Sequence, residues 1–550
     1  MKKHSIQLFS LVIFFFLTVS AQKNDQNSSK LQNLFKEWRS FEIPPIVYGA
    51  PDYKKITFDK RFSEFLKLKS MLCDIDKSSL STEEKVDWTL IWAEMNGYLF
   101  NYKVLKPWER DPAFYKTIWT SRSDVPAHEG PSHHNLVELW KYKFPLNSVD
   151  KLKLISDLKV IPNLNKQAKQ NLIGNARDLW ITGIRTIKRQ SSDLKSLLIR
   201  IDPLDKGISK VIIDAISSTN EFIGWLEKEA INKNGPSGIG KENYTWYQKN
   251  VHLVPLTWEQ EVILLKNELA RAWTSLKYEE KNNSKLPYLS AVNNSKEYDE
   301  LAKKSAEELL SFLDDQKIIT VKPYYKDALQ PHLGKFIPKY KRNFFWITAH
   351  YDPKPLYSHF FHWFELAQMD IDPHKNEIRR KPLLYNIFDS RSEGVATAVE
   401  ELFMQAGLYK NNPRAREIVY ILIAQRAARG LGSLYAHANI MSMEEAGKIH
   451  SEYTPRGWMK TEKDLLIFEQ HLYLRQPGYG TSYITGKYLL ESAIADYSKI
   501  NEEENSKEII KDFFDLLMSI GNIPMTLVHW QMTNSNAHIK DLINECELNL

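Results

Sequence analysis

Histidines and carboxylates occur at helical spacing in the segment from Tyr357 to Gln368. His359, His362 and Glu365 follow one another at steps of three residues, and Glu393 lies further along the chain. Residues three apart lie near each other on a helix, and imidazole and carboxylate groups are ligands that zinc takes in proteins. These four residues are candidate metal ligands, and Glu365 is also a candidate general base. Because aromatic residues separate them, the alternative is that the histidines are hydrogen-bonded core groups.

Glu393 has two interpretations. With Glu400 seven residues later, it lies on one face of a predicted helix. The order Ser390-Arg-Ser-Glu393 also fits a capping box, in which the glutamate only satisfies backbone N–H groups at a helix start. The residue pattern alone favours the capping role.

A second group of histidines occurs at His128-Glu129-Gly-Pro-Ser-His133-His134. Three imidazoles and a carboxylate this close together can bind a metal ion at modest affinity. Gly130 and Pro131 exclude a regular helix, however, and so exclude the geometry of a helical zinc motif. The pattern favours a surface turn, with a loop that folds over a cleft and lends it a ligand as the alternative.

Helical periodicity dominates the chain and predicts a mainly α fold. Trp258, Val262, Leu265, Leu269 and Trp273 form one apolar stripe, and Thr257 with Gln260 has the pattern of a capping box at its start. Similar periodicity predicts helices near residues 83–102, 209–231, 298–313, 416–438 and 508–519.

One segment breaks the helical pattern close to the candidate ligands. Residues 343–350 are aromatic and β-branched, which predicts a small β element that Asp352-Pro-Lys-Pro355 would end. The exposed edge of such a strand could pair with an extended peptide, although a strand in a small structural sheet is the equal alternative. We divide the mature chain into an N-terminal helical region, residues 22–320, and a C-terminal region, residues 321–550.

The ends and the composition limit the protein class. A basic start, an apolar run from Leu8 to Val19 and then Ser20-Ala21 have the order of a cleavable signal peptide over residues 1–21. We therefore expect a secreted or periplasmic protein that starts at Gln22 and has no membrane span. A net charge of +6, with both signs interspersed, favours neither nucleic acid nor anionic membranes as partners. Cys73 and Cys546 leave a single disulfide bridge open.

Several short motifs occur in an order that resembles a known family. They include Glu393-Gly394-Val-Ala396 followed by Gly407-Leu-Tyr409, then Arg426-Ala-Ala-Arg429, His437, and Gln476-Pro-Gly478 with Ser482-Tyr483. Together with Trp108-Glu-Arg-Asp-Pro112 and Gly240-Lys-Glu-Asn-Tyr244, they resemble the bacterial family called domain of unknown function 885. The likeness extends over most of the mature chain.

The resemblance implies a large helical fold akin to zinc metallopeptidases, with a His-Glu-x-x-Pro-Gly-His-His-x-Gln helix before a Glu-Gly-x-Ala helix. His359 then takes the position of the first histidine, Glu365 that of a later one, and Glu393 that of the downstream metal ligand. His437 and Tyr483 match positions that steady an oxyanion. Phe360 stands where the family carries the glutamate that accepts a proton from metal-bound water, so this chain lacks that catalytic group.

These patterns lead to one expected function and two alternatives. We expect a metallopeptidase-like pseudoenzyme with a degenerate zinc centre, which binds peptide-like ligands and has lost glutamate-dependent hydrolysis. The first alternative is an active metal-dependent hydrolase that uses Glu365, Glu400 or Glu129 as its base. The second is a structural or interaction protein in which no metal binds. The sequence leaves the oligomeric state open.

Overall fold

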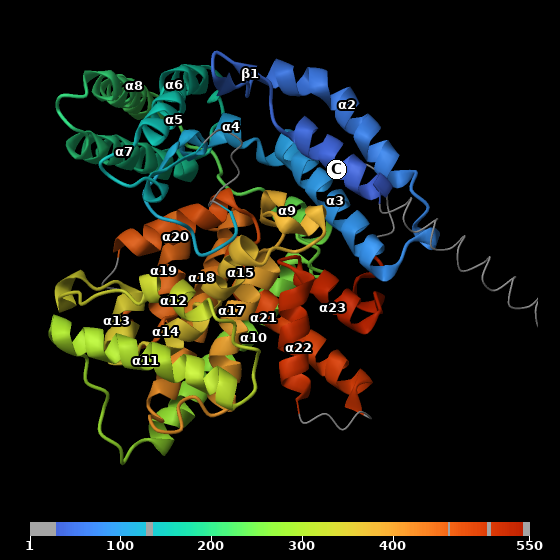
Figure 1. The fold of residues 1–550 in the computed structure, drawn as a ribbon, viewed down its shortest axis with the longest axis vertical. Helices are drawn as coiled ribbons and strands as arrows, with labels where there is room; N and C mark the ends of the chain where they lie inside the picture. Colours follow the sequence, from blue (N-terminus) through green and yellow to red (C-terminus); the bar gives the residue numbers. More distant parts are fainter. Residues whose placement is uncertain (1–28, 128–135, 460–462, 503–507, 543–550) are drawn as a thin grey trace, which may run out of the picture.

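The computed structural model describes residues 29–127, 136–459, 463–502 and 508–542, and most of these residues are helical (Figure 1). This confirms the mainly α fold class. Within these ranges the strands are two residues long and form two small sheets. β1 (Ile46–Val47) pairs antiparallel with β2 (Ala50–Pro51), and β3 (Ile118–Trp119) pairs parallel with β4 (Val137–Glu138).

A helix over residues 29–42 opens the described chain. The helices that follow as far as residue 320 are α2 (Lys55–Cys73), α3 (Thr82–Phe100), α4 (Pro107–Arg110), α5 (Ser148–Leu158), α6 (Val160–Asn171), α7 (Arg177–Arg200), α8 (Lys206–Ala230), α9 (Lys241–Asn250), α10 (Trp258–Asn282) and α11 (Ser295–Asp315). A π-helical turn, η2 (Asn101–Leu105), continues α3.

The later helices are α12 (Tyr325–Leu329), α13 (Phe344–Tyr351), α14 (Lys354–His359), α15 (Phe361–Ile371), α16 (Glu377–Arg380), α17 (Asp389–Gln405), α18 (Ala415–His437), α19 (Met443–Tyr453), α20 (Lys463–Arg475), α21 (Tyr479–Ile500), α22 (Ile509–Ile520) and α23 (Met525–Thr533). Short 3-10 turns connect several of the elements: η1 (Lys77–Ser79), η3 (Pro112–Tyr115), η4 (Leu139–Lys141), η5 (Gln330–His332), η6 (Lys339–Lys341), η7 (Leu384–Asn386), η8 (Pro455–Gly457) and η11 (Ala537–Ile539).

The centre of the molecule is a group of long helices, α10, α17, α18 and α21, which pack against one another. α18 is buried on nearly all sides, as expected for a helix surrounded by others. α17 and α21 approach closely because glycines face each other: a Cβ on Gly394 would lie 2.5 Å from the Cα of Gly486. These central helices carry most of the candidate site residues.

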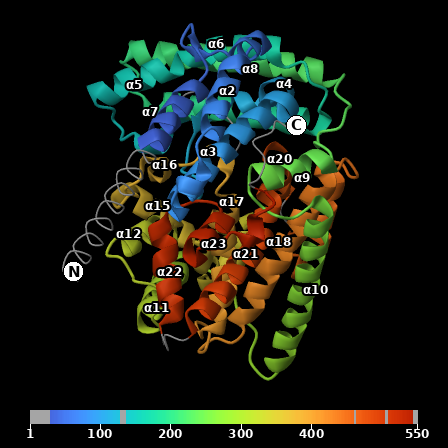
Figure 2. The same ribbon diagram turned by 90° about the vertical axis from the view of Figure 1, so that its right-hand side faces the viewer.

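A second layer of helices, α5 to α8, covers one end of the central group (Figure 2). It has its own apolar core, formed by the side chains Ile118, Val137, Leu139, Tyr142, Leu154, Leu158, Ile161, Leu194, Leu197, Ile201, Ile208, Ile212 and Ala215. The main apolar core extends from Leu31 to Ile539. Helices before and after residue 320 share this main core, since α3 packs on α23 and α10 on α18.

The prediction of a strand at residues 343–350 is wrong. These residues form α13, in which the side chain of Asn343 accepts a hydrogen bond from the backbone N–H of Trp346 at 3.0 Å. The aromatic and β-branched composition favours a strand only where another strand can pair with it, and the neighbours here are helices such as α14. This segment therefore offers no sheet edge to an extended peptide.

The helices predicted near residues 83–102, 209–231, 258–273, 298–313, 416–438 and 508–519 agree with the structure. α10 starts with the predicted capping box, because Thr257 accepts from the N–H of Gln260 while the Gln260 side chain accepts from the N–H of Thr257. Among the described residues, no helix is both long and apolar enough to cross a membrane.

Candidate metal centre

Two short helices bring His359 and His362 to one point. His359 is the last residue of α14, and His362 is the second residue of α15. The single helix predicted over this segment is interrupted at Phe360, which lies between the two helices. The two imidazole rings lie 5.0 Å apart at an angle of 85°, so their nitrogens can approach a common centre.

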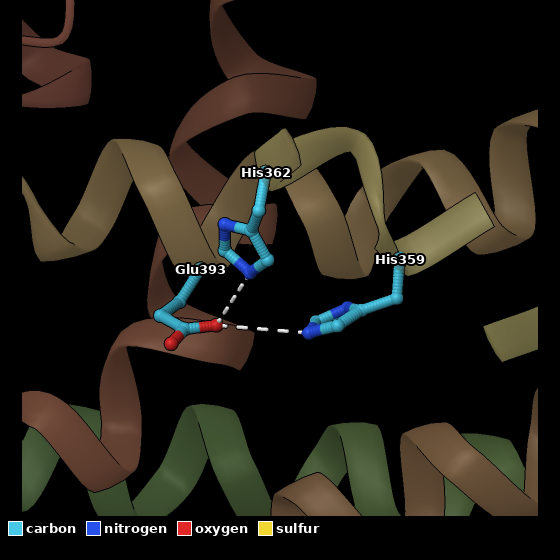
Figure 3. A group of neighbouring side chains, drawn as sticks. All are labelled: His359, His362 and Glu393. Carbon is cyan, nitrogen blue, oxygen red and sulfur yellow. Dashed lines mark hydrogen bonds and ion pairs between the residues drawn. The ribbon is translucent and has the colours of Figure 1, made fainter. Parts of the chain in front are cut away.

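Glu393 completes a group of three potential ligands (Figure 3). Its Oε2 atom lies 3.1 Å from Nε2 of His362 and 3.7 Å from Nε2 of His359. In a tetrahedral zinc site with bonds of about 2.1 Å, neighbouring ligand atoms lie about 3.4 Å apart. The two distances lie on either side of that value, and all three ligand atoms lie within 4.8 Å of one another, so they are close enough to share a divalent ion.

The role of Glu393 as a helix cap is wrong. α17 begins at Asp389, and its start has no side-chain cap hydrogen bond. The hydroxyl of Ser390 accepts from the N–H of Met525 at 3.2 Å. Glu393 thus lies within the helix, and its carboxylate faces His359 and His362.

A second carboxylate lies beside His359. Oε1 of Glu400 lies 3.0 Å from Nδ1 of His359, and Glu400 is in turn held by the guanidinium of Arg426 at 2.5 and 2.8 Å. A histidine metal ligand commonly has a carboxylate at its other ring nitrogen, which fixes the ring and strengthens the ligand. Glu400 is therefore placed to orient His359 toward the centre.

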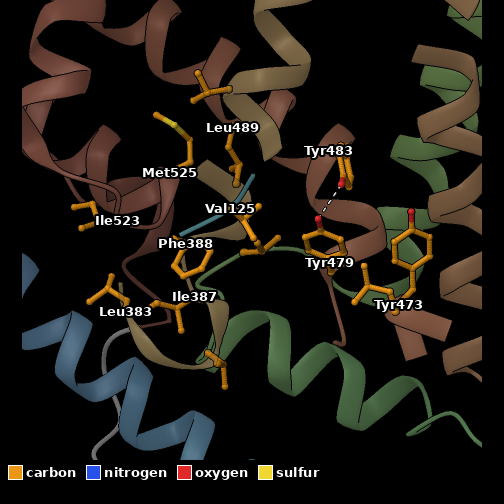
Figure 4. Close-up of a cluster of buried hydrophobic side chains, with 14 of the residues drawn as sticks. Val125, Leu383, Ile387, Phe388, Tyr473, Tyr479, Tyr483, Leu489, Ile523 and Met525 are labelled. Carbon is orange, nitrogen blue, oxygen red and sulfur yellow. Dashed lines mark hydrogen bonds between the residues drawn. The ribbon is translucent and has the colours of Figure 1, made fainter. Parts of the chain in front are cut away.

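Two tyrosines of α21 extend the network on the other side of Glu393. The hydroxyl of Tyr479 donates to Oε1 of Glu393 at 2.5 Å, and Tyr483 donates to the Tyr479 hydroxyl at 3.1 Å (Figure 4). Arg429 lies over the ring of Tyr483, 3.7 Å from its centroid. Tyr483, an oxyanion candidate from the sequence, is thus beside the centre and also stacks on His359.

Burial and neighbouring charges set the protonation of this group. Burial alone would lower the pKa of His362, but the Glu393 carboxylate outweighs it and raises that pKa. Burial likewise would raise the pKa of Glu393, yet the two histidines hold it well below its ordinary range. Burial, with Arg426 nearby, lowers the pKa of His359. Without a metal, the centre is a His362–Glu393 ion pair beside a neutral His359.

Glu365, the fourth predicted ligand and the candidate base, lies elsewhere. Its Oε1 accepts from Nε of Arg391 at 2.9 Å, and both side chains are buried. It is not part of the group formed by His359, His362 and Glu393. The interruption at Phe360 moves His359 relative to α15, so the steps of three residues do not place all three side chains on one side.

His437 is likewise not one of the three ligands, and its side chain contacts other residues. Its Nε2 lies 2.8 Å from the carbonyl oxygen of Tyr473, and its ring packs on Tyr244 at 5.4 Å. Burial lowers its pKa to about 4, so it is neutral at physiological pH. These contacts give His437 the features of a structural core histidine.

Sequence reasoning missed Tyr479. A signal for it exists, because Tyr479 and Tyr483 are four residues apart and so share a face of α21. Other predictions fall outside the described residues: the segment from His128 to His134, Cys546 and the signal peptide with Gln22. Asp124, which precedes that segment, is near enough for its charge to raise the pKa of His362.

Comparisons with known proteins give information about the fold alone. No family model and no curated protein matches the chain. A solved structure of a putative lipoprotein of unknown function from Shewanella oneidensis is similar, with 15% identity, a TM-score of 0.64 and coverage of 93% of this chain and 99% of that chain. A putative lipoprotein from Colwellia psychrerythraea aligns with 14% identity, a TM-score of 0.66 and coverage of 94% and 99%. At this level of identity the likeness shows a shared fold along nearly the whole chain.

Proposed function

We propose that this protein is an extracytoplasmic, metallopeptidase-like protein that holds a divalent metal ion, with zinc as the best fit, and binds peptide-like ligands without hydrolysing them by the usual glutamate route. The observation that carries the proposal is the convergence of His359, His362 and Glu393 within 4.8 Å. Two imidazoles and one carboxylate leave a fourth position for an external ligand.

Each residue of this centre would have its own role in binding the metal. His359 and His362 would each offer Nε2, and Glu393 would offer Oε2. Glu400, which pairs with Arg426, lies beside the ring of His359, while the Tyr479 hydroxyl donates to the second oxygen of Glu393. When bound, the metal would supply Lewis acidity toward a carbonyl oxygen of the ligand.

The missing proton acceptor is the reason for proposing binding without turnover. Phe360 follows His359 and cannot accept a proton. The carboxylates that could replace it are engaged with arginines, Glu365 with Arg391 and Glu400 with Arg426. Burial outweighs the arginine in each pair and raises the pKa of both carboxyls, that of Glu400 to about 7. The ion pairs with arginine, which hold both carboxylates in place, count against the active-hydrolase alternative.

The proposed location rests on two supports. The chain begins with the order of a signal peptide, and the two similar solved structures are described as putative lipoproteins. The resemblance to the domain of unknown function 885 family remains part of the proposal, since it rests on the motifs alone.

A turnover assay with a binding readout tests the proposal. We expect the zinc-loaded protein to leave a mixture of fluorogenic peptides uncleaved, while the same peptides bind more weakly after chelator treatment. Cleavage that chelator and Glu393→Gln both abolish would contradict the loss of hydrolysis. Peptide binding that is absent in zinc-loaded protein would contradict the binding role.

A further inference from the structure

A small cavity lies where α7 and α20 pack against each other. Its volume is about 70 Å³, well below that of sites for drug-sized ligands, so it has room for one small chemical group. The wall comes from α7, α20 and the side chains of Lys116 and Trp119, and it does not include His359, His362 or Glu393. The metal-site proposal therefore does not explain this cavity.

The wall of this cavity is positively charged. Among the described residues, no aspartate or glutamate lines it, whereas four cationic side chains do: Lys116, Arg185, Arg189 and Arg475. Two carboxylates lie behind these cations. Asp111 accepts from Nε of Arg475 at 2.6 Å, and burial raises the pKa of Asp193 while the charges of Lys116 and Arg189 oppose that shift. Positive charges outnumber negative ones in this part of the described chain, which favours an anion as ligand.

Arg475 is the wall residue that points most clearly to a ligand. Its side chain is only 8% exposed, and the hydrogen bond to Asp111 fixes its Nε. Its two terminal nitrogens, Nη1 and Nη2, keep accessible surface and have no hydrogen-bond partner in the part of the chain that the structure describes. A guanidinium donates from a planar fork that matches the oxygens of phosphate and carboxylate groups. A buried arginine with two donors left over at a cavity indicates an oxyanion site.

The other cations come from different segments of the chain. Nζ of Lys116 lies over the ring of Trp119, 3.5 Å from its centroid, and this contact holds the ammonium at the wall. Arg185 and Arg189 are four residues apart on α7 and so share one face of it, while Arg475 ends α20. A phosphate group has three acceptor oxygens and close to two negative charges. It therefore matches donors from three segments better than a carboxylate does.

We propose that the cavity between α7 and α20 binds a phosphate group. The group can be free inorganic phosphate or the phosphate of an organic ester. In the second case the organic part would lie against Phe468, which lines the cavity and is 41% exposed. This inference is independent of metal binding.

Calorimetric titration of the full chain, stripped of metal so that phosphate cannot bind to zinc, distinguishes these sources. The probes are inorganic phosphate, phenyl phosphate and acetate, at equal ionic strength and above the second pKa of a phosphate ester, about 6. We expect phosphate to bind, and acetate to bind at least tenfold more weakly. Tighter binding of phenyl phosphate identifies an ester as the source, whereas equal or weaker binding identifies free phosphate. The proposal is wrong if neither phosphate binds, or if acetate binds as tightly.

Two neighbouring cations of α7 provide a matched control for the site. Arg189→Gln should weaken phosphate binding about fivefold or more, and Arg475→Lys should weaken it too, because lysine keeps the charge but lacks the fork. Lys188→Gln removes the same charge as Arg189→Gln but should leave binding unchanged, since Lys188 pairs with Glu227 and does not line the cavity. Equal effects of the two α7 substitutions would overturn the assignment. Glu393→Gln should retain phosphate binding, which separates this test from that of the metal centre.

Discussion

Oε1 of Glu400 lies 3.0 Å from Nδ1 of His359, so a second carboxylate lies beside the ring nitrogen that does not face Glu393, although this contact does not have the geometry of a hydrogen bond. The same Glu400 carboxylate pairs with Arg426. All three side chains are buried. This relay from α18 through α17 to α14 is the arrangement that orients a histidine ligand in metal sites.

The relay predicts an effect of Glu400 on metal affinity. Glu400→Gln should weaken zinc binding about 10- to 100-fold, because loss of the carboxylate lowers the basicity of His359 and frees its ring. Glu401→Gln is the matched control, since the adjacent Glu401 pairs with Arg271 and Lys487 instead. Competition titration with a zinc-binding dye measures both. Equal affinities of the two variants would contradict the relay.

The close approach of α17 and α21 predicts that adding a methyl group changes stability in opposite directions at two glycines. Gly394→Ala should lower the free energy of unfolding by about 2 kcal/mol, because its Cβ would overlap the backbone of Gly486. Gly224→Ala in α8 should instead raise it by about 0.5 to 1 kcal/mol, since the added Cβ meets no atom within 4 Å. Urea unfolding of both variants checks this pair, and a similar shift in both would count against it.

A buried carboxyl predicts a specific dependence of stability on pH. Glu261 is fully buried and accepts from Thr485 at 2.8 Å, and burial raises its pKa to about 7. Since the folded-state pKa lies above the unfolded value of about 4.5, this group stabilises the fold fully below pH 4.5. That stabilisation, about 3 kcal/mol, should be lost as pH rises to about 7.

Comparison with Glu261→Gln isolates this contribution. The amide does not titrate, so the variant should lose less stability than the parent between pH 5 and pH 8. Chemical unfolding at the two pH values gives the difference. A parent and variant with the same pH dependence would show that Glu261 is not protonated in the folded protein.

The helices could be predicted from the sequence because apolar stripes and helix caps are patterns of residues that lie close together in the chain. The periodicity of residues 258–273 and the Thr257–Gln260 cap identified the start of α10, and the spacing of Glu393 and Glu400 placed both on one face of α17. The strand predicted at 343–350 failed because β propensity depends on a pairing partner, which is a tertiary feature.

Only part of the site could be predicted from the sequence, because several of its contacts join residues that are far apart in the chain. His359, His362 and Glu393 were identified by residue type, but the position of Glu365 depended on an interruption at Phe360 that no proline or glycine marks. Its pairing with Arg391 and the contact of Tyr479 with Glu393 join segments far apart in the chain. Local patterns carry no information about such contacts.

Calorimetric titration of zinc into the chelator-stripped protein tests the metal centre most directly. The parent should bind one zinc ion per chain at this centre, and Glu393→Gln and His359→Ala should each weaken that binding at least tenfold, because each removes one of three ligands. His133→Ala should leave it unchanged. No zinc binding to the parent, or loss of binding confined to His133→Ala, would contradict the account.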